Sequence, residues 1–450
     1  MDIGNNQVKL LKFAKDYVNK TEAKLINSGT SSLCFFSSWF PNMGYAKLKL
    51  FSSGYLYLPK YLFLLSKNLL SIAKYNDYSL ANRRQDNSLY NKVIISNCTA
   101  SSFDEDGNFF DNNFNLNSGN CTSILWFLTS VDNKFPKNLN HNVRILYKNK
   151  NKKYSFVFLI KTILKILKQN RYSVKNIKHE IFVDSFFSRY FAEFFFDEII
   201  GGNFKLAAFP YEGQPFLHNV TFLFKKKYNN IVTVGYHSSL PPIPTSLLYR
   251  VGSPDVLLVN GDDQLFYLQT FLNWDLNKVR KISSQKFTNK SNDEIFNCVY
   301  LPYIIFSEKI ILNTIDSYLN IAKDFSLLKL TVKIHPSQID NPHHIKMMAK
   351  INKILMKHKT KFKNNEGLRN SIVIGPSALV IEHLEKKINF VQLCVNPSFE
   401  VYSETIWPNI QARKVSKHLY TYNLKSFGKT LDLNKNKIDF NEFFDDIIKN

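Results

Sequence analysis

Three short segments of the chain carry side chains that can move protons or bind phosphate. The first is the turn sequence Glu212-Gly213-Gln214, which follows the apolar stretch Leu206–Pro210. A carboxylate on a tight turn suits a general base, because it can be held close to the proton that it removes. We predict Glu212 as a catalytic base and Gly213 and Gln214 as residues of the substrate cleft. An ordinary turn with a solvated glutamate is the alternative.

The second segment is Lys333-Ile334-His335-Pro336. Proline disfavours helical backbone at the residue before it, so Pro336 ends the strand and keeps His335 extended. The imidazole is then expected to point out of the end of the sheet, where it could bond a phosphate. We predict His335 as a catalytic residue that also binds a nucleotide donor, together with Lys333 and Pro336. A surface histidine at a strand end is the alternative.

The third segment is Gly375-Pro376-Ser377, with Glu382 five residues beyond the serine. Gly375 lets backbone approach a ligand, and Ser377 would begin a helix whose N–H groups favour an anion. Glu382 could hold ribose hydroxyls. An ordinary capping serine and a surface glutamate are the alternative for these two residues.

We expect His335 and Ser377 to follow neighbouring strands of one sheet. Ligands of open α/β sheets lie outside the carboxyl ends of the strands, so the two side chains would share a crevice. All the donor-site residues predicted here then belong to a single nucleotide phosphate site.

Two further segments compete for a role. His237 and Ser238 follow an expected strand, where polar groups suit a substrate cleft, although a simple loop explains them equally well. Asp106, in the acidic segment Asp104–Gly107, is the second candidate for the base, but it lies in the most loop-like stretch of the chain. No P-loop, HExxH, GxSxG or GxGxxG sequence occurs, and we expect no metal and no cofactor.

The elements that must position these residues can be recognised from their apolar patterns. Short apolar, β-branched runs predict buried strands, and segments with a 3.6-residue period predict helices between them. The expected strands are Lys92–Ser96, Val143–Tyr147, Ile231–Gly235, Val256–Asn260, Leu330–His335, Ser371–Gly375 and Phe390–Val395. The expected helices include Tyr154–Gln169, Ser307–Lys323, His343–Lys357 and Ser377–Lys387. Alternating strands and helices predict an α/β fold with doubly wound sheets.

The length of 450 residues exceeds that of one ordinary domain. The segment around residues 285–300 is polar and irregular, and we place a boundary there. We predict a first domain over residues 1–285, a second over 286–430 and a C-terminal helix over 431–450.

The chain is strongly basic, with 59 Lys and Arg against 36 Asp and Glu and a net charge of +23. Such a charge favours an anionic partner. The abundance of Lys, Asn, Phe and Tyr also fits AT-rich codons, which would account for much of the charge without a partner. No concentrated basic and aromatic module occurs, so we expect no nucleic-acid partner.

The cysteines are scattered and odd in number, which favours a reducing compartment. They are Cys34, Cys98, Cys121, Cys298 and Cys394. We recognise no leader, and the most apolar stretch, Tyr154–Leu167, is interrupted by Lys161 and Lys165. We expect a cytoplasmic protein, with peripheral attachment to the inner membrane face left open.

These motifs together resemble those of bacterial sialyltransferases and polysialyltransferases of the GT-B fold. That family has an acidic-Gly motif, a His-Pro motif and a Ser-Ser or Ser-Thr motif. The corresponding pairs here are Glu212-Gly213, His335-Pro336 and Ser377-Ala378. The chain departs from the family at Ala378, where a second hydroxyl residue is expected, and at Tyr211, where a second acid is expected.

The segment from Tyr211 to Gly261 also looks like a family of bacterial surface-carbohydrate biosynthesis proteins. The two likenesses together cover roughly residues 205–410. They imply two Rossmann-type domains that face a central cleft, the first binding an acceptor and the second a nucleotide sugar.

The resemblance implies a metal-independent glycosyltransferase. It would move a nonulosonic acid of the sialic, pseudaminic or legionaminic type from its CMP-activated form to a bacterial surface glycan of capsule or lipopolysaccharide, free or lipid-linked. Glu212 would deprotonate the acceptor, and His335 and Ser377 would stabilise the departing CMP. Lys333 would approach the cytosine or phosphate and Glu382 the ribose, with His237 and Ser238 lining the cleft.

Two alternatives stay open. The first is a GT-B transferase that uses CMP-Kdo or a UDP sugar. The second is a non-enzymatic protein that binds polyanions or a membrane surface through its positive charge.

Overall fold

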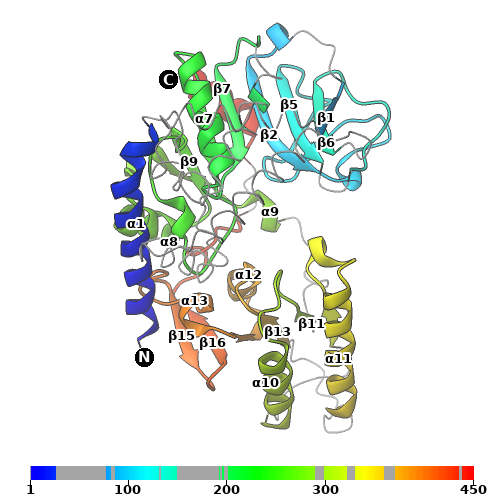
Figure 1. Ribbon diagram of the computed structural model, residues 1–450, viewed down its shortest axis with the longest axis vertical. Coiled ribbons are helices and arrows are strands. Elements are labelled where there is room, and N and C mark those ends of the chain that lie inside the picture. Colours follow the sequence, from blue (N-terminus) through cyan, green and yellow to red (C-terminus); the bar gives the residue numbers. More distant parts are fainter. Residues whose placement is uncertain are drawn as a thin grey trace, which may run out of the picture.

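The computed structural model describes residues 2–26, 78–82, 87–130, 133–148, 192, 195–196, 201–288, 298–321, 330–358, 370–434 and 438–449. Over these residues the protein is mixed α/β and contains two mainly parallel sheets (Figure 1). The predicted α/β class is confirmed. The expected helix Tyr154–Gln169 lies outside the described residues.

The first sheet has eight strands in the order β1-β6-β5-β2-β7-β8-β9-β10. Their bounds are β1 Tyr78–Ala81, β2 Lys92–Cys98, β5 Ile124–Ser130, β6 Val143–Lys148, β7 Leu206–Pro210, β8 Val232–Tyr236, β9 Val256–Val259 and β10 Val279–Lys281. Only β1 is antiparallel to its neighbour. After β2 the chain adds β5 and β6 on one side and β7 to β10 on the other, so the winding reverses between β2 and β7.

Both faces of this sheet are covered, which explains why its strands are continuously apolar. Along β2, Val93 and Ile95 face a core that includes residues of helices α7 (Pro215–Lys227) and α8 (Asp262–Leu272). Ile94 faces the other core, which includes residues of α14 (Phe440–Lys449). We call this sheet with α7, α8 and α14 the first lobe.

A small two-stranded sheet and a short helix complete this part of the chain. The strands are β3 (Phe110–Asp111) and β4 (Leu116–Asn117), and the helix is α9 (Gln285–Thr288). Phe114, between the two strands, packs edge-on against Phe440 of α14. The C-terminal helix is thereby fixed to the first lobe, and an ion pair of 2.7 Å between Lys92 and Asp445 adds to this attachment.

The second sheet has six strands in the order β12-β11-β13-β14-β16-β15. Their bounds are β11 Cys298–Tyr300, β12 Thr331–Lys333, β13 Asn370–Ile374, β14 Asn389–Leu393, β15 Ile410–Lys414 and β16 Leu419–Leu424. The first four are parallel, and the hairpin of β15 and β16 is antiparallel. One face packs on α10 (Glu308–Ile321) and α11 (Pro342–His358), and the other on α12 (Leu379–Glu385). We call this sheet and its helices, with α13 (Pro397–Glu400), the second lobe.

The strands and helices expected within the described residues are confirmed to within a few residues at their ends. One expectation about their arrangement was wrong. His335 and Ser377 do not follow neighbouring strands, because β11 lies between β12 and β13. This strand has only three residues, Cys298–Tyr300, and was too short to show a pattern in the sequence.

The two lobes share one hydrophobic core, and the segment Val401–Trp407 contributes Val401, Tyr402, Ile406 and Trp407 to it. The Tyr402 hydroxyl lies 2.7 Å from the Leu240 carbonyl oxygen of the first lobe and 2.8 Å from the Ser377 carbonyl oxygen of the second. The Trp407 indole donates to the Pro242 carbonyl oxygen at 3.1 Å. We call Val401–Trp407 the joint segment.

Helix α1 (Ile3–Ile26) runs along the side of both lobes (Figure 1). Leu10, Leu11 and Ala14 are buried in the shared core. The Gln7 side chain donates to the Val401 carbonyl oxygen at 2.8 Å, so the helix also holds the joint segment. Over the described part of the chain, no helix combines the length and the apolar character needed to cross a bilayer.

Replacing Tyr402 with Phe tests the joint segment. The variant loses a buried hydroxyl whose single proton is shared between two carbonyl oxygens. The Leu240 oxygen loses this donor, whereas the Ser377 oxygen still accepts from Val380 N at 3.2 Å, so we expect a loss of about 1–2 kcal/mol of unfolding free energy. Amide exchange at Leu240, in the other lobe, should become faster. Urea denaturation and hydrogen exchange measure these two effects.

The matched control is Tyr422→Phe, because the Tyr422 hydroxyl bonds Gln392 within the second lobe. It should destabilise the protein without changing exchange at Leu240. Unchanged exchange at Leu240 in the Tyr402→Phe variant would contradict the role of the joint segment.

Candidate functional site

The strand order of the first sheet places Glu212 at a position suited to a ligand. In open α/β sheets, ligands bind outside the carboxyl ends of the strands, where the winding reverses. That reversal lies between β2 and β7, and Glu212 is the second residue after β7. Glu212 therefore stands at the carboxyl edge, beside the reversal.

The turn that carries Glu212 is rigid. Gly213 has φ +72°, and a Cβ atom there would lie 1.8 Å from the Ser246 carbonyl oxygen, so only glycine fits. The Glu212 N–H donates to the Gln214 side-chain oxygen at 2.8 Å, and Pro215 begins α7 directly afterwards. The half-buried Glu212 side chain is thus presented from a fixed backbone.

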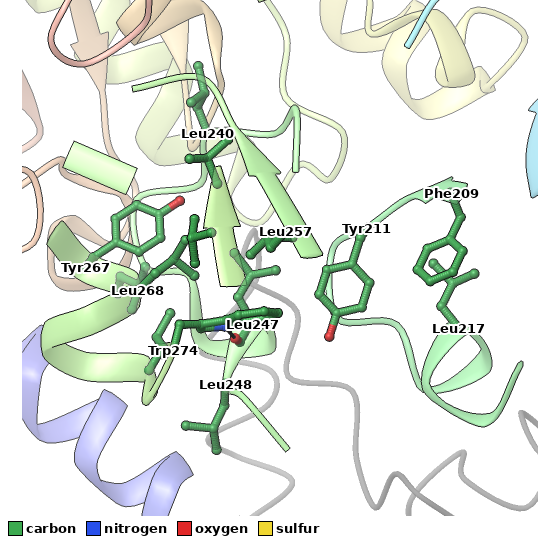
Figure 2. Packing of buried hydrophobic residues seen from close by; sticks show 14 of the residues in the cluster. Phe209, Tyr211, Leu217, Leu240, Leu247, Leu248, Leu257, Tyr267, Leu268 and Trp274 are labelled. Atoms are coloured by element: carbon green, nitrogen blue, oxygen red, sulfur yellow. Dashed lines mark hydrogen bonds between the residues drawn. The ribbon is translucent and has the colours of Figure 1, made fainter. Parts of the chain in front are cut away.

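A buried polar chain lies under this turn. The Tyr211 hydroxyl bonds His218 Nε2, and His218 Nδ1 accepts from Arg250 Nε at 2.9 Å. Arginine only donates, so the histidine proton is on Nε2 and is donated to the Tyr211 oxygen. Burial, with the Arg250 charge, lowers the pKa of His218 well below its ordinary value. Figure 2 shows the Tyr211 ring with Leu257 on one side and Phe209 and Leu217 on the other.

The structure buries His237 and Ser238. The His237 ring lies 3.2 Å from the Tyr211 carbonyl oxygen through Nδ1 and 3.1 Å from the Tyr267 hydroxyl through Nε2. Burial lowers the pKa of His237 to about 3, so the ring is neutral. Its Nδ1 therefore donates to the carbonyl, and both ring nitrogens hold neighbouring segments together rather than face an open surface.

The competing acid, Asp106, lies at the opposite edge of the first sheet. The Gly107 carbonyl oxygen accepts from Asn140 N at 3.2 Å, and Asn140 stands just before β6 begins. Since β6 runs parallel to β5 and β2, its beginning marks the amino edge. Glu212 and Asp106 are therefore separated by the length of the strands.

In the second lobe, His335 is exposed at the end of β12. Its ring meets the Tyr303 ring edge-on, with centroids 5.4 Å apart, and Tyr303 lies in the segment after β11. The Ser337 N–H donates to His335 Nδ1 at 3.3 Å, so the neutral ring carries its proton on Nε2. His335 and Tyr303 form an exposed pair of rings at the carboxyl edge of the second sheet.

The other predicted donor residues lie around this edge. Pro336 is exposed, and the Lys333 ammonium lies 5.9 Å from the centre of the Tyr300 ring. Gly375 has φ +71°, and a Cβ atom there would lie 3.2 Å from Pro302 at the end of β11. The winding of the second sheet reverses between β11 and β13. The close approach of Gly375 and Pro302 therefore lies at the point of reversal, where open α/β sheets bind ligands.

Pro376 and Ser377 continue from Gly375 at partly buried positions. The Ser377 hydroxyl accepts from Leu379 N at 3.3 Å, and the Ser377 carbonyl accepts from Tyr402. Glu382 is different, because its side chain is fully buried and forms an ion pair of 2.9 Å with Lys386. The structure thus leaves Glu382 inside the second lobe.

Sequence reasoning missed Tyr303, Tyr402 and Arg250. The first follows a strand that was not recognised, and the other two act through contacts with residues far away in the sequence. A pocket of about 480 Å³ lies elsewhere, between the β3–β4 region and the start of α14, and no predicted site residue lines it. Within the described ranges, no group of three or more His, Cys, Asp or Glu side chains could hold a metal ion.

No family model matches the chain, and no curated protein matches it. Among solved structures, the chain is similar to a glycosyltransferase from Rickettsia africae ESF-5, with 11% identity over 70% of this chain and 87% of that chain and a TM-score of 0.30. It is also similar to the N-terminal domain of Candida albicans trehalose-6-phosphate phosphatase, with 10% identity over 70% of this chain and 88% of that chain and a TM-score of 0.32. TM-scores this low decide neither fold nor function.

Substituting Gly213 by Ala tests the rigidity of the turn that carries Glu212. The new methyl group would meet a backbone oxygen, and the positive φ adds strain, so we expect a loss of about 3 kcal/mol or more of unfolding free energy. The control is Gly201→Ala, because Gly201 has φ +108° but nothing lies within 4 Å of its Cβ position. Urea denaturation of the two variants measures the difference, and equal losses would contradict the close contact.

Proposed function

We propose that the protein is a glycosyltransferase with a GT-B-like arrangement, which moves a nonulosonic acid from its CMP-activated form to a glycan. One observation carries the proposal. The Tyr402 hydroxyl bonds carbonyl oxygens that follow β8 in the first lobe and β13 in the second. Both carbonyl oxygens lie at the carboxyl edge of their sheet, so this contact joins the two edges. Glu212 lies on the edge of the first lobe and His335 on that of the second, which supports a shared site for a base and a phosphate-binding group.

In this proposal Glu212 removes the proton from the acceptor hydroxyl. The hydroxyl oxygen forms a bond to the anomeric carbon, and the bond from that carbon to the phosphate oxygen breaks, with its electron pair leaving on CMP. The half-buried position and fixed turn of Glu212 support this role, because a general base needs a set geometry. The distance of Asp106 from this edge favours Glu212 over it.

In this proposal His335 donates a hydrogen bond to the phosphate oxygen on which negative charge grows as CMP leaves. The Ser337 N–H occupies Nδ1, so Nε2–H of the neutral ring is the donating atom. A donor already aimed at developing charge lowers the barrier without reorganising in the reaction. Tyr303, edge-on to His335, offers a ring on which a cytosine could stack.

Lys333, Pro336, Gly375, Pro376 and Ser377 would surround the nucleotide. The Lys333 charge would approach the phosphate, and the Gly375 backbone would allow close contact. The buried ion pair of Glu382 with Lys386 keeps that carboxylate out of the proposed site, so the ribose would need another partner. His237 would act only by holding the backbone of Tyr211 in place.

The acceptor would be a bacterial surface glycan or its lipid-linked precursor, and the reaction would need no metal. The alternative sugar donors are CMP-Kdo and a UDP sugar. A thermal-shift panel of CMP, UDP, ADP and GDP separates them, because a ligand of the native state raises its melting temperature.

The roles of Glu212 and His335 can be separated in one set of measurements. Glu212→Gln should lower transfer from CMP-sialic acid by about a hundredfold or more and leave CMP affinity unchanged. His335→Ala should weaken CMP binding by about tenfold, since it removes one donor to a charged group. Calorimetry with CMP and release of CMP from the donor are the readouts.

The control is His343→Ala, an exposed histidine on α11, which should change neither readout. Full transfer by Glu212→Gln would exclude that residue as the base. Unchanged CMP affinity in His335→Ala would exclude the imidazole from the nucleotide-binding site. Stronger binding of UDP than of CMP would show that the sugar donor is a UDP sugar rather than a CMP-activated sugar.

A further inference from the structure

Helix α11 (Pro342–His358) has an unusual composition for a helix on the outside of a sheet. Its sequence contains four lysines and three histidines but no aspartate or glutamate. The helix covers one face of the second sheet together with α10. All of its charged side chains are therefore basic, and its outer face is suited to a negatively charged partner.

The inner face of α11 is settled by packing. Met347 and Ile351 are fully buried against the second sheet, and His344 and His358 are also buried. His344 Nε2 lies 3.0 Å from the Pro302 carbonyl oxygen, and His358 Nε2 lies 2.7 Å from Asp316 of α10. The inner face needs no further partner.

The outer face carries a stripe of apolar side chains. Ile345 is 45% exposed and Met356 is 71% exposed. They are eleven positions apart, which is about three helical turns, so both lie on nearly the same line along the helix. Ala349 is exposed on that line between them. Ile339, 59% exposed, precedes the helix in the segment after His335.

Lysines flank this stripe on one side. Lys350 and Lys357 form ion pairs with Glu308 and Asp316 of α10. Lys346 and Lys353 are exposed. The Lys346 charge acts on Glu308, which pairs with Lys350, and within the described ranges neither Lys346 nor Lys353 forms an ion pair of its own. At about 100° per residue, both stand roughly a quarter-turn from Ile345. The outer face is thus an apolar line beside a line of positive charge.

An apolar line beside lysines fits the surface of an anionic bilayer. Such a surface takes apolar side chains between its headgroups and attracts the ammonium groups by charge. The net charge of +23 acts in the same direction. Nucleic acid would meet the lysines but would gain little from exposed Ile345 and Met356.

We propose that the outer face of α11 docks the protein on an anionic membrane surface, with Ile339, Ile345 and Met356 among the headgroups and Lys346 and Lys353 against anionic lipid. The inference does not rest on the proposed enzymatic function. It identifies a surface on the second lobe, formed by a helix that carries no residue of the proposed donor site.

Co-sedimentation with vesicles tests this docking surface. The full chain should bind vesicles of phosphatidylcholine with 30% phosphatidylglycerol and bind much less to phosphatidylcholine alone, and binding should fall as salt is raised. The double variant Ile345→Glu/Met356→Glu should lose binding by at least tenfold. Lys346→Gln/Lys353→Gln should lose roughly fivefold for each lysine removed.

The matched control is Leu89→Glu/Leu276→Glu, which makes the same change at side chains 73% and 46% exposed in the first lobe. It should keep full binding, and unchanged melting temperatures confirm that both double variants fold. Equal losses in the two Glu pairs would show that added negative charge alone is responsible, which overturns the proposal. Equal binding to neutral vesicles would also overturn it, as would tighter binding to a single-stranded RNA than to the anionic vesicles.

Discussion

The rest of the architecture depends on the burial of the joint segment between the two lobes. Tyr402 and Trp407 are fully buried, and each directs its polar atom to a backbone carbonyl of the first lobe. Aromatic side chains of this size bury much apolar area, and the hydrogen bonds satisfy groups that burial would otherwise leave at a cost. This joins the two sheets through one core rather than through a surface contact.

The joint segment also determines which edges of the sheets meet. Leu240 follows β8 and Ser377 follows β13, and both are bonded to one hydroxyl. The carboxyl edges are the places where doubly wound sheets bind ligands, so the contact that stabilises the fold also joins the two edges on which the proposed site lies. The turn of Glu212 is fixed by Gly213, and the ring of His335 is oriented by Ser337. Each candidate group is thus held by its own lobe.

The sequence was sufficient to predict those strands and helices whose own apolar residues show that they are buried. The apolar run of β8 and the segment Lys333–Pro336 each predicted a strand end with a polar group after it. It was insufficient where partners come from elsewhere in the chain. Strand β11 has three residues and is defined by its neighbours β12 and β13, so its position between them was missed.

The same limit applies to side-chain roles. Glu382 and His237 have the residue types of a binding site, but Lys386 pairs with the first and Tyr267 bonds the second in the interior. Tyr402 could not be recognised at all, because its two acceptors lie in distant parts of the chain. Patterns of residue type therefore identified the edges of the sheets, while packing decided which side chains are available there.

We propose that the two carboxyl edges form one site for a CMP-activated sugar. Hydrogen exchange of the full chain, with and without a fluorinated, unreactive analogue of CMP-sialic acid, tests it most directly. The account predicts slower exchange in both lobes at once, at Gly213 and Gln214 after β7 and at Tyr303 and His335 beside β12. Protection confined to one lobe, or found instead beside α14 around Asn117 and Asn441, would contradict it.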